Sequence, residues 1–189
     1  MESFFIEKKM TYDGQQLHSL FAYLEHGILG PSIVSWRGAC DIPFSRMVDG
    51  EDLLAKAVIQ GQEMLHFIIE VFDRDLFSGV ALQRLFAAIT RDYLQKQAAK
   101  TLSGHHLIRE GDDLYWGDRK LSISIATKSP VSTMVHFAMN ITNQGTPVKT
   151  LSLEDLDLDP RQVASDLMDL FKKEYSDIVV ATQKVRPVG

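Results

Sequence analysis

The strongest constraint on the fold is a run of alternating apolar and polar residues that begins after Gly104. Such alternation is typical of β-strands that bury one face. Glycine-containing turns divide the run, so we predict successive strands at 106–109, 113–116, 119–127 and 131–142. The short connection between the last two strands favours an antiparallel hairpin.

Helices and further strands surround this run. We predict the longest helix after Ser78, a candidate N-cap, and a last helix that begins at Asp159–Pro160, because proline suits the first helical position. A helix over 17–24 should end at Gly27, and Asp49 should cap a brief one. Further strands are predicted at 3–9, 32–37, 64–72 and 178–182. The expected fold is one α+β domain over residues 1–189, ordered from about 4 to 182 with a short C-terminal tail. Its sheet should be mixed and mainly antiparallel, with packed helices.

Composition limits the possible partners. Twenty Lys and Arg face 25 Asp and Glu, a net charge of −5 without a basic stripe, so we expect no nucleic-acid partner. The single cysteine excludes an internal disulfide and a Cys-rich zinc site. The N-terminus has no signal-peptide core, and no window approaches ~18 consecutive apolar residues. We therefore expect a cytoplasmic protein without a membrane partner; its oligomeric state is unknown from sequence.

The faces of the predicted hairpin point to a site. In the strand 131–142, an apolar face that includes Val135 and Phe137 lies opposite His136 and Asn140. In the strand 119–127, we assign Leu121, Ile123 and Ile125 to the core. The opposite face then carries Lys120, Ser122, Ser124 and Ala126. Pairing Ala126 with Met134 then puts Ser124 opposite His136 and Lys120 opposite Asn140.

Two interpretations of this polar face stay open. It is either an ordinary half-solvated sheet surface or the floor of a ligand site. Small side chains favour the second, because they leave room for a ligand. The candidate binding residues here are Lys120, Ser122, His136 and Asn140.

The strand 64–72 adds two candidates, His66 and Glu70, on one face. Four residues of strand span ~13 Å, so these two side chains cannot share a metal ion. The acidic run from Asp155 resembles the start of a calcium loop but has Pro160 where that loop needs glycine. We predict no metal site.

The segment Trp36 to Asp41 gives a third group. A strand that ends at Arg37 and continues into small residues and Asp41 predicts an anion-facing loop. The alternative is a tight strand-end turn that buries Cys40. We take Arg37, Cys40 and Asp41 as candidate ligand-binding residues.

Several segments together resemble known families. Residues 109–122, and Lys120-Leu121-Ser122 in particular, resemble the central signature of biotin and lipoate protein ligases. The chain as a whole is similar to a prokaryotic family catalogued as domain of unknown function 366. The segments that carry this second resemblance are Tyr12-Asp13-Gly14, Gly27-Ile28-Leu29-Gly30, Trp36-Arg37-Gly38-Ala39-Cys40-Asp41, Met64-Leu65-His66-Phe67 and Lys120-Leu121-Ser122.

The resemblance implies a fold and a chemistry. The fold would be similar to the catalytic core shared by biotin/lipoate ligases and class II aminoacyl-tRNA synthetases. Lys120 would bind a carboxylate and an adenylate phosphate, and Asp113 would lie beside the nucleotide, with ATP and Mg²⁺ as cofactors if the protein adenylates.

The polar face and the resemblance are compatible with two functions. One is an acyl-transferring or acyl-adenylating enzyme with Lys120 as the catalytic residue and a small carboxylate or acyl ligand. The other is a non-catalytic small-molecule binding protein that kept the ligase-like pocket. A thiol reaction at Cys40 is a third, separate possibility.

Overall fold

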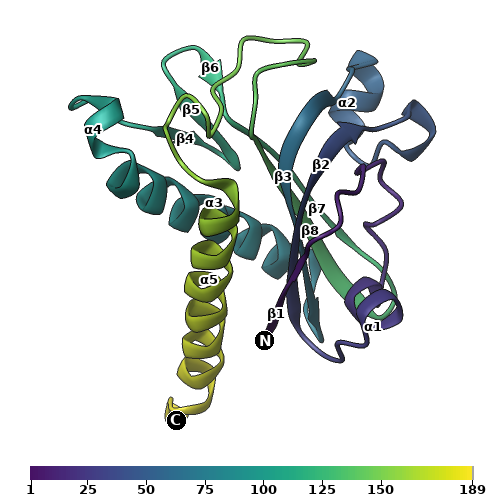
Figure 1. Cartoon of the computed structure of the whole chain (residues 1–189). Helices are drawn as coiled ribbons and strands as arrows, with labels where there is room; N and C mark the ends of the chain where they lie inside the picture. Colours follow the sequence, from purple (N-terminus) through teal and green to yellow (C-terminus); the bar gives the residue numbers. More distant parts are fainter. Residues whose placement is uncertain (189) are drawn as a thin grey trace.

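A computed structural model describes residues 1–188 of the chain (Figure 1). Its elements, in chain order, are β1 (Glu2–Ile6), α1 (Phe21–His26), β2 (Ser32–Asp41), the 3-10 helix η1 (Phe44–Arg46), α2 (Gly50–Ala55), β3 (Gln60–Phe72), α3 (Leu76–Gln97), α4 (Ala99–Leu102), β4 (Ile108–Glu110), β5 (Asp113–Trp116), β6 (Arg119–Lys120), β7 (Ser122–Lys128), β8 (Ser132–Asn140) and α5 (Pro160–Gln183).

Two sheets organise these elements. The larger has the strand order β1-β2-β3-β8-β7, in which β1 is parallel to β2 and every other pair is antiparallel. The smaller has the order β4-β5-β6. The predicted α+β class with a mixed, mainly antiparallel sheet and packed helices is confirmed.

One face of the large sheet is covered by α3 and α5, which cross on the same side of it in Figure 1. Alternation along β3 turns Leu65, Phe67 and Ile69 toward these helices. Phe86 of α3 and Phe171 of α5 meet them in an edge-to-face aromatic cluster. This layer is the main hydrophobic core of the protein.

The opposite face of the sheet carries a smaller core. Tyr12, Phe21 and Trp36 pack there against Met64 and Ile68 of β3. This second cluster is why the other face of β3 is too apolar to be a simple solvent surface. The remainder of this face is the floor of a cavity.

The predicted hairpin forms, but with β7 shifted by one residue. Ser124 pairs with Phe137, and Ile125 pairs with His136. Because a one-residue slip exchanges the two faces of a strand, the assignment of Ile123 and Ile125 to the main core is wrong. Leu121 lies in the gap between β6 and β7 and joins the main core, so alternation is broken at that point.

Strand β2 is longer than predicted and passes straight through the expected loop. Its pairing with β3 runs to Asp41, with an irregularity between Gly38 and Cys40. Gly38 lies so close to the chain at Met10 that a Cβ there would be 1.9 Å from the Met10 carbonyl oxygen. The prediction of a loop or turn after Arg37 is therefore wrong, because backbone pairing continues across the small residues.

Two helix predictions need correction as well. The strand expected at 178–182 is the end of α5, where Ile178 and Val179 pack against the main core. The N-cap of α3 is Asp75, whose carboxylate accepts from the Ser78 main-chain N–H, so Ser78 is not the cap. Asp159 caps α5 as predicted.

Among residues 1–188, no helix is long and apolar enough to cross a membrane.

Candidate functional site

A cavity of about 440 Å³ lies on the face of the sheet that α3 and α5 leave free. Its floor comes from β3, β7 and β8, one wall from residues 42–60, and another from β5, β6 and the loop 146–150. Figure 1 shows α2 and the β5–β6 hairpin at the same end of the large sheet. We call this space the Lys120 cavity.

The floor of the Lys120 cavity combines apolar and polar side chains. Met64 of β3 and Ile123 and Ile125 of β7 line it. The shifted register of β7 puts these isoleucines on the floor, beside His136 and Asn140 of β8. An apolar surface with a few polar groups is typical of small-molecule sites.

Lys120 and Asp113 form an ion pair in the wall of the cavity. The Lys120 Nζ lies 2.6 Å from Oδ2 of Asp113, and strand pairing between β5 and β6 brings the two residues together. Burial alone would lower the pKa of Lys120, but the hydrogen bond and the charge of Asp113 outweigh burial and raise it. Lys120 therefore stays protonated, and its ammonium keeps donors beyond the one used by Asp113.

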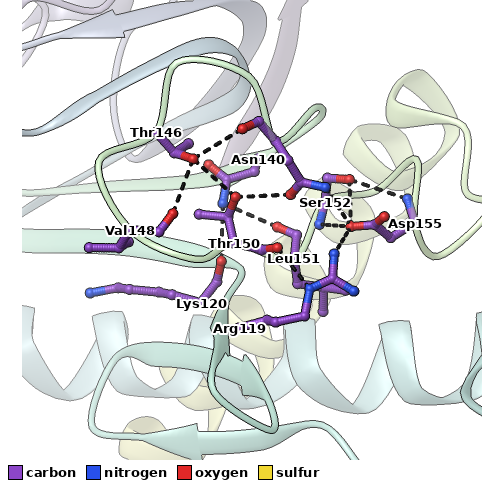
Figure 2. Close-up of polar contacts among 10 residues, drawn as sticks. Arg119, Lys120, Asn140, Thr146, Val148, Thr150, Leu151, Ser152 and Asp155 are labelled. Atoms are coloured by element: carbon purple, nitrogen blue, oxygen red, sulfur yellow. Dashed lines mark hydrogen bonds and ion pairs between the residues drawn. The ribbon is translucent and has the colours of Figure 1, made fainter.

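Asn140 of β8, in the large sheet, holds the main chain of Lys120 of β6, in the smaller sheet (Figure 2). Its Nδ2 donates to the carbonyl of Lys120 at 3.2 Å and to that of Leu151 at 3.1 Å. The main-chain N–H of Leu151 donates to the Lys120 carbonyl as well. Lys120 is thus fixed by a buried amide, which positions it without contacting its ammonium.

A second polar cluster fixes the outer side of the same segment (Figure 2). Asp155 accepts hydrogen bonds from the side chains of Arg119 and Asn143 and from the main chain and hydroxyl of Ser152. Thr150 links to this cluster through Asn143 Oδ1 at 2.9 Å. The loop 146–150 and the β6 strand are therefore tied together at the rim of the cavity.

Acidic side chains outnumber basic ones in the lining of the Lys120 cavity. Two cations line it, Arg46 and Lys120, and both are already ion-paired, with Asp13 and Asp113. The carboxylates that line it are Asp49, Glu51, Asp52, Asp112 and Asp113.

Two of these carboxylates have a raised pKa. Burial, and then the charge of nearby carboxylates, raise the pKa of Asp52 and of Asp112. Asp112 receives a hydrogen bond from Gln83 at 2.8 Å and lies 3.3 Å from Arg84. Among residues 1–188, the Asp52 carboxylate has no hydrogen-bond or ion-pair partner. No group of three or more potential metal ligands was found in this part of the chain.

Two buried histidines lie at the inner end of the floor. His66 Nδ1 is 3.2 Å from His136 Nε2, and His66 Nε2 is 3.2 Å from the Gly38 carbonyl. Burial lowers the pKa of His66 to about 4, and burial together with His66 lowers that of His136. Both rings are neutral at pH 7, so His66 donates to the carbonyl and accepts from His136. The Tyr12 ring stacks on His136 at 3.6 Å between centroids.

The sequence-predicted residues divide into two groups. Lys120, Asp113, Ser122, His136 and Asn140 line the cavity together, and His66 lies behind His136. Ser122 Oγ accepts from the main-chain N–H of Leu114 and so ties β7 to β5. The functional roles predicted for these residues stay predictions.

The other predicted residues lie outside the lining of the cavity. Arg37 is paired with Glu63 at 2.6 Å, and the exposed Asp41 accepts a hydrogen bond from Gln60. Glu70 is buried and accepts from the main-chain N–H of Leu20 at 2.7 Å, which holds the turn before α1. Cys40 is buried in the smaller core, and burial, with a contribution from Asp41, raises its pKa to about 12. The structure does not bring these four residues to the Lys120 cavity, and the ligand-binding roles predicted for them stay predictions.

Several residues that line the cavity were not predicted from the sequence. Tyr12 comes from a loop, Asp52 from α2 and Met64 from β3, and none of them has a pattern that points to a site. Ile123 and Ile125 were missed because their face depends on a one-residue register. Only the crossing of distant segments brings these residues together.

The comparisons with known proteins agree with this fold. The family model described as "Domain of unknown function (DUF366)" matches residues 1–186. The uncharacterised protein MJ0805 of Methanocaldococcus jannaschii is 31% identical over 195 residues, covering 100% of this chain and 86% of that protein. A solved structure of a protein of unknown function from Pyrococcus horikoshi is 36% identical, with a TM-score of 0.92, covering 100% of this chain and 99% of that one.

More distant structures share the fold at low identity. A biotin protein ligase from Aquifex aeolicus, in complex with biotin and ATP, has a TM-score of 0.58 at 12% identity, covering 89% of this chain and 68% of that one. LipL1 of P. falciparum, in complex with lipoate, has a TM-score of 0.55 at 12% identity, covering 100% of this chain and 65% of that one. The predicted resemblance of the fold to the biotin/lipoate ligase core is confirmed.

Proposed function

The chain belongs to the family of Domain of unknown function (DUF366) proteins, and from its cavity we propose that it binds a small carboxylic acid or acyl compound against Lys120 and transfers or activates the acyl group. The observation that carries the proposal is the protonated Lys120 ammonium, fixed at the edge of an apolar floor. A carboxylate on Lys120 and an apolar chain on Met64, Ile123 and Ile125 would use both features.

The chemistry expected of Lys120 follows from its surroundings. Acyl transfer builds negative charge on the former carbonyl oxygen, and a cation held in advance stabilises that charge most strongly as it develops. Asn140 and the main chain of Leu151 hold the backbone of Lys120, so little reorganisation is needed when a ligand arrives. Lys120 would keep its bond to Asp113 and use a second N–H for the ligand.

The distant structural relatives support the kind of ligand, by analogy of fold. The Aquifex aeolicus ligase is in complex with biotin and ATP, and the P. falciparum protein with lipoate. Biotin and lipoate are both carboxylic acids with a largely apolar body. A cavity with one lysine and an apolar floor suits compounds of that kind.

A nucleotide fits the lining residues poorly. A triphosphate needs cations, but both cations of the lining are already paired, and five carboxylates line the same cavity. This charge balance favours a second candidate function, binding of the small molecule without nucleotide-dependent chemistry.

Exchange of labelled pyrophosphate into ATP separates the two candidates. Pools of biotin, lipoate, octanoate and amino acids are tested with Mg²⁺ on the wild type and on Lys120→Ala. Acid-dependent exchange that disappears in the variant would establish an adenylating enzyme. If no pool gives exchange while an acid still stabilises the wild type against heat, the protein binds the acid without adenylating it.

A further inference from the structure

The charge of the Lys120 cavity is the wrong sign for a simple carboxylic acid. Besides Asp113, which is paired with Lys120, the lining contains Asp49, Glu51, Asp52 and Asp112. Among residues 1–188, only Asp112 of these four has an ion-pair partner, Arg84. A ligand with a carboxylate alone would be attracted by one ammonium and repelled by this excess of negative charge. Among residues 1–188, these carboxylates do not form a cluster of three or more potential metal ligands.

A polar acceptor on the lining adds to the same requirement. Both side-chain hydrogen bonds of Asn140 use Nδ2 as donor to a main-chain carbonyl. These two carbonyls fix the orientation of the amide, and Oδ1 is an acceptor that keeps access to solvent. Asn140 lines the cavity, so a ligand N–H would take the place of water at this oxygen.

The Lys120–Asp113 pair sets the spacing of the complementary charges. Its ammonium and carboxylate lie 2.6 Å apart, so a ligand that matches both must carry its own carboxylate and ammonium close together. The α-carbon of an amino acid carries the two groups at about that separation. The apolar floor of Met64, Ile123 and Ile125 then leaves room for an uncharged side chain.

We propose that the ligand of the cavity is an α-amino acid with an apolar side chain, whose carboxylate binds Lys120 and whose ammonium binds among Asp113, Asp52 and the Asn140 oxygen. This inference rests on the proposed function, because it identifies the acid that Lys120 binds. It also explains why Asp52 is on the wall of the cavity without a partner in the protein.

The test compares matched ligands by calorimetry and thermal unfolding. Leucine is compared with 4-methylpentanoate, which lacks only the ammonium, and with 3-methylbutylamine, which lacks only the carboxylate. Phenylalanine is compared in the same way with 3-phenylpropanoate and 2-phenylethylamine. We expect at least one amino acid to bind about tenfold or more tightly than both of its analogues. A factor of this size corresponds to the loss of one charge-assisted hydrogen bond.

Two variants locate the ammonium. Asp52→Asn removes a charge whose side chain has no hydrogen-bond or ion-pair partner among residues 1–188, and it should weaken amino-acid binding about tenfold. Asp92→Asn removes the same charge from an exposed site on α3 outside the cavity, and it should bind like the wild type.

The outcomes are distinct. If a deaminated acid binds as well as its amino acid, and Lys120→Ala abolishes both, the inference fails and the proposed function stands. If the amine alone binds as well as the amino acid, the ammonium belongs to a separate amine, and the inference also fails. If neither amino acid binds, the inference fails, and the wider range of acids in the final experiment below decides the proposed function.

Discussion

Asn140 of β8 donates both of its amide hydrogens to main-chain carbonyls, one of which is the carbonyl of Lys120 at 3.2 Å. A residue of the central sheet thereby fixes a residue of the β5–β6 hairpin, which belongs to the smaller sheet. The position of Lys120 is therefore built on the core of the fold.

Replacing Asn140 with alanine should weaken the fold and displace Lys120. Two carbonyls lose their side-chain donor, so we expect the free energy of unfolding to fall by about 1–3 kcal/mol. Urea denaturation measures the change. Gln144→Ala, an exposed neighbour, is the control and should stay within about 0.5 kcal/mol of the wild type. An unchanged stability for Asn140→Ala would show that the two side-chain hydrogen bonds of Asn140 do not stabilise the fold.

Replacing Lys120 with alanine should affect binding and leave folding nearly intact. The Lys120–Asp113 pair is partly exposed to solvent, and pairs of that kind contribute about 0–1 kcal/mol. We expect unfolding to change by no more than this amount, while stabilisation by any carboxylate ligand is lost. A large loss of stability would mean that Lys120 is a structural residue instead.

The buried histidines should make the protein sensitive to acid. The pKa of His66 falls from 6.5 in the unfolded chain to about 4 in the folded protein, so the unfolded state binds its proton first. This part of the stability is fully present above pH 6.5 and is lost as the pH falls toward 4. The loss is on the order of 3 kcal/mol.

His66→Gln tests that pH dependence against His105→Gln, which removes an exposed histidine. Denaturation midpoints at pH 7.5 and pH 4.5 should differ less for His66→Gln than for the wild type. His105→Gln should follow the wild type. Equal pH dependence in all three proteins would show that His66 is not a buried neutral imidazole.

Gly38→Ala should destabilise β2 strongly. The added Cβ would lie 1.9 Å from the carbonyl oxygen of Met10, which is main chain and cannot turn away. We expect a loss of about 1–3 kcal/mol, or failure to fold. Gly50→Ala is the matched control, because a Cβ there meets nothing within 4 Å. Similar stabilities for the two variants would show that Met10 is free to move.

Cys40 should not react in the native protein. Burial raises the pKa of its thiol to about 12, so little thiolate exists at pH 8. An aromatic disulfide reagent should titrate Cys40 only after denaturant is added. Rapid reaction of the folded protein would revive a thiol function for Cys40.

The sequence predicted the helices, most strands and the faces of β3 and β8, because those patterns depend on local periodicity. It missed the end of α5, where Ile178 and Val179 are equally compatible with a strand. It also misassigned β7, since a register error of one residue exchanges its faces.

The candidate site was predicted in part for a related reason. Lys120, His136 and Asn140 follow from the hairpin and meet at the cavity. Arg37 and Cys40 were predicted to lie in an anion-facing loop because the segment after Trp36 has the composition of a loop, whereas pairing with β3 continues through it. Asp52 and Tyr12 reach the cavity through long-range packing, which no local pattern encodes.

The most direct test of the central claim is thermal unfolding with pooled small carboxylic acids, including fatty, heterocyclic and amino acids. Wild type, Lys120→Ala and Arg37→Ala are compared, since Arg37 is a cation outside the cavity lining. At least one acid should raise the melting temperature of the wild type and of Arg37→Ala and leave that of Lys120→Ala unchanged. If no acid stabilises the wild type, or if Lys120→Ala responds equally, carboxylate binding at Lys120 is wrong.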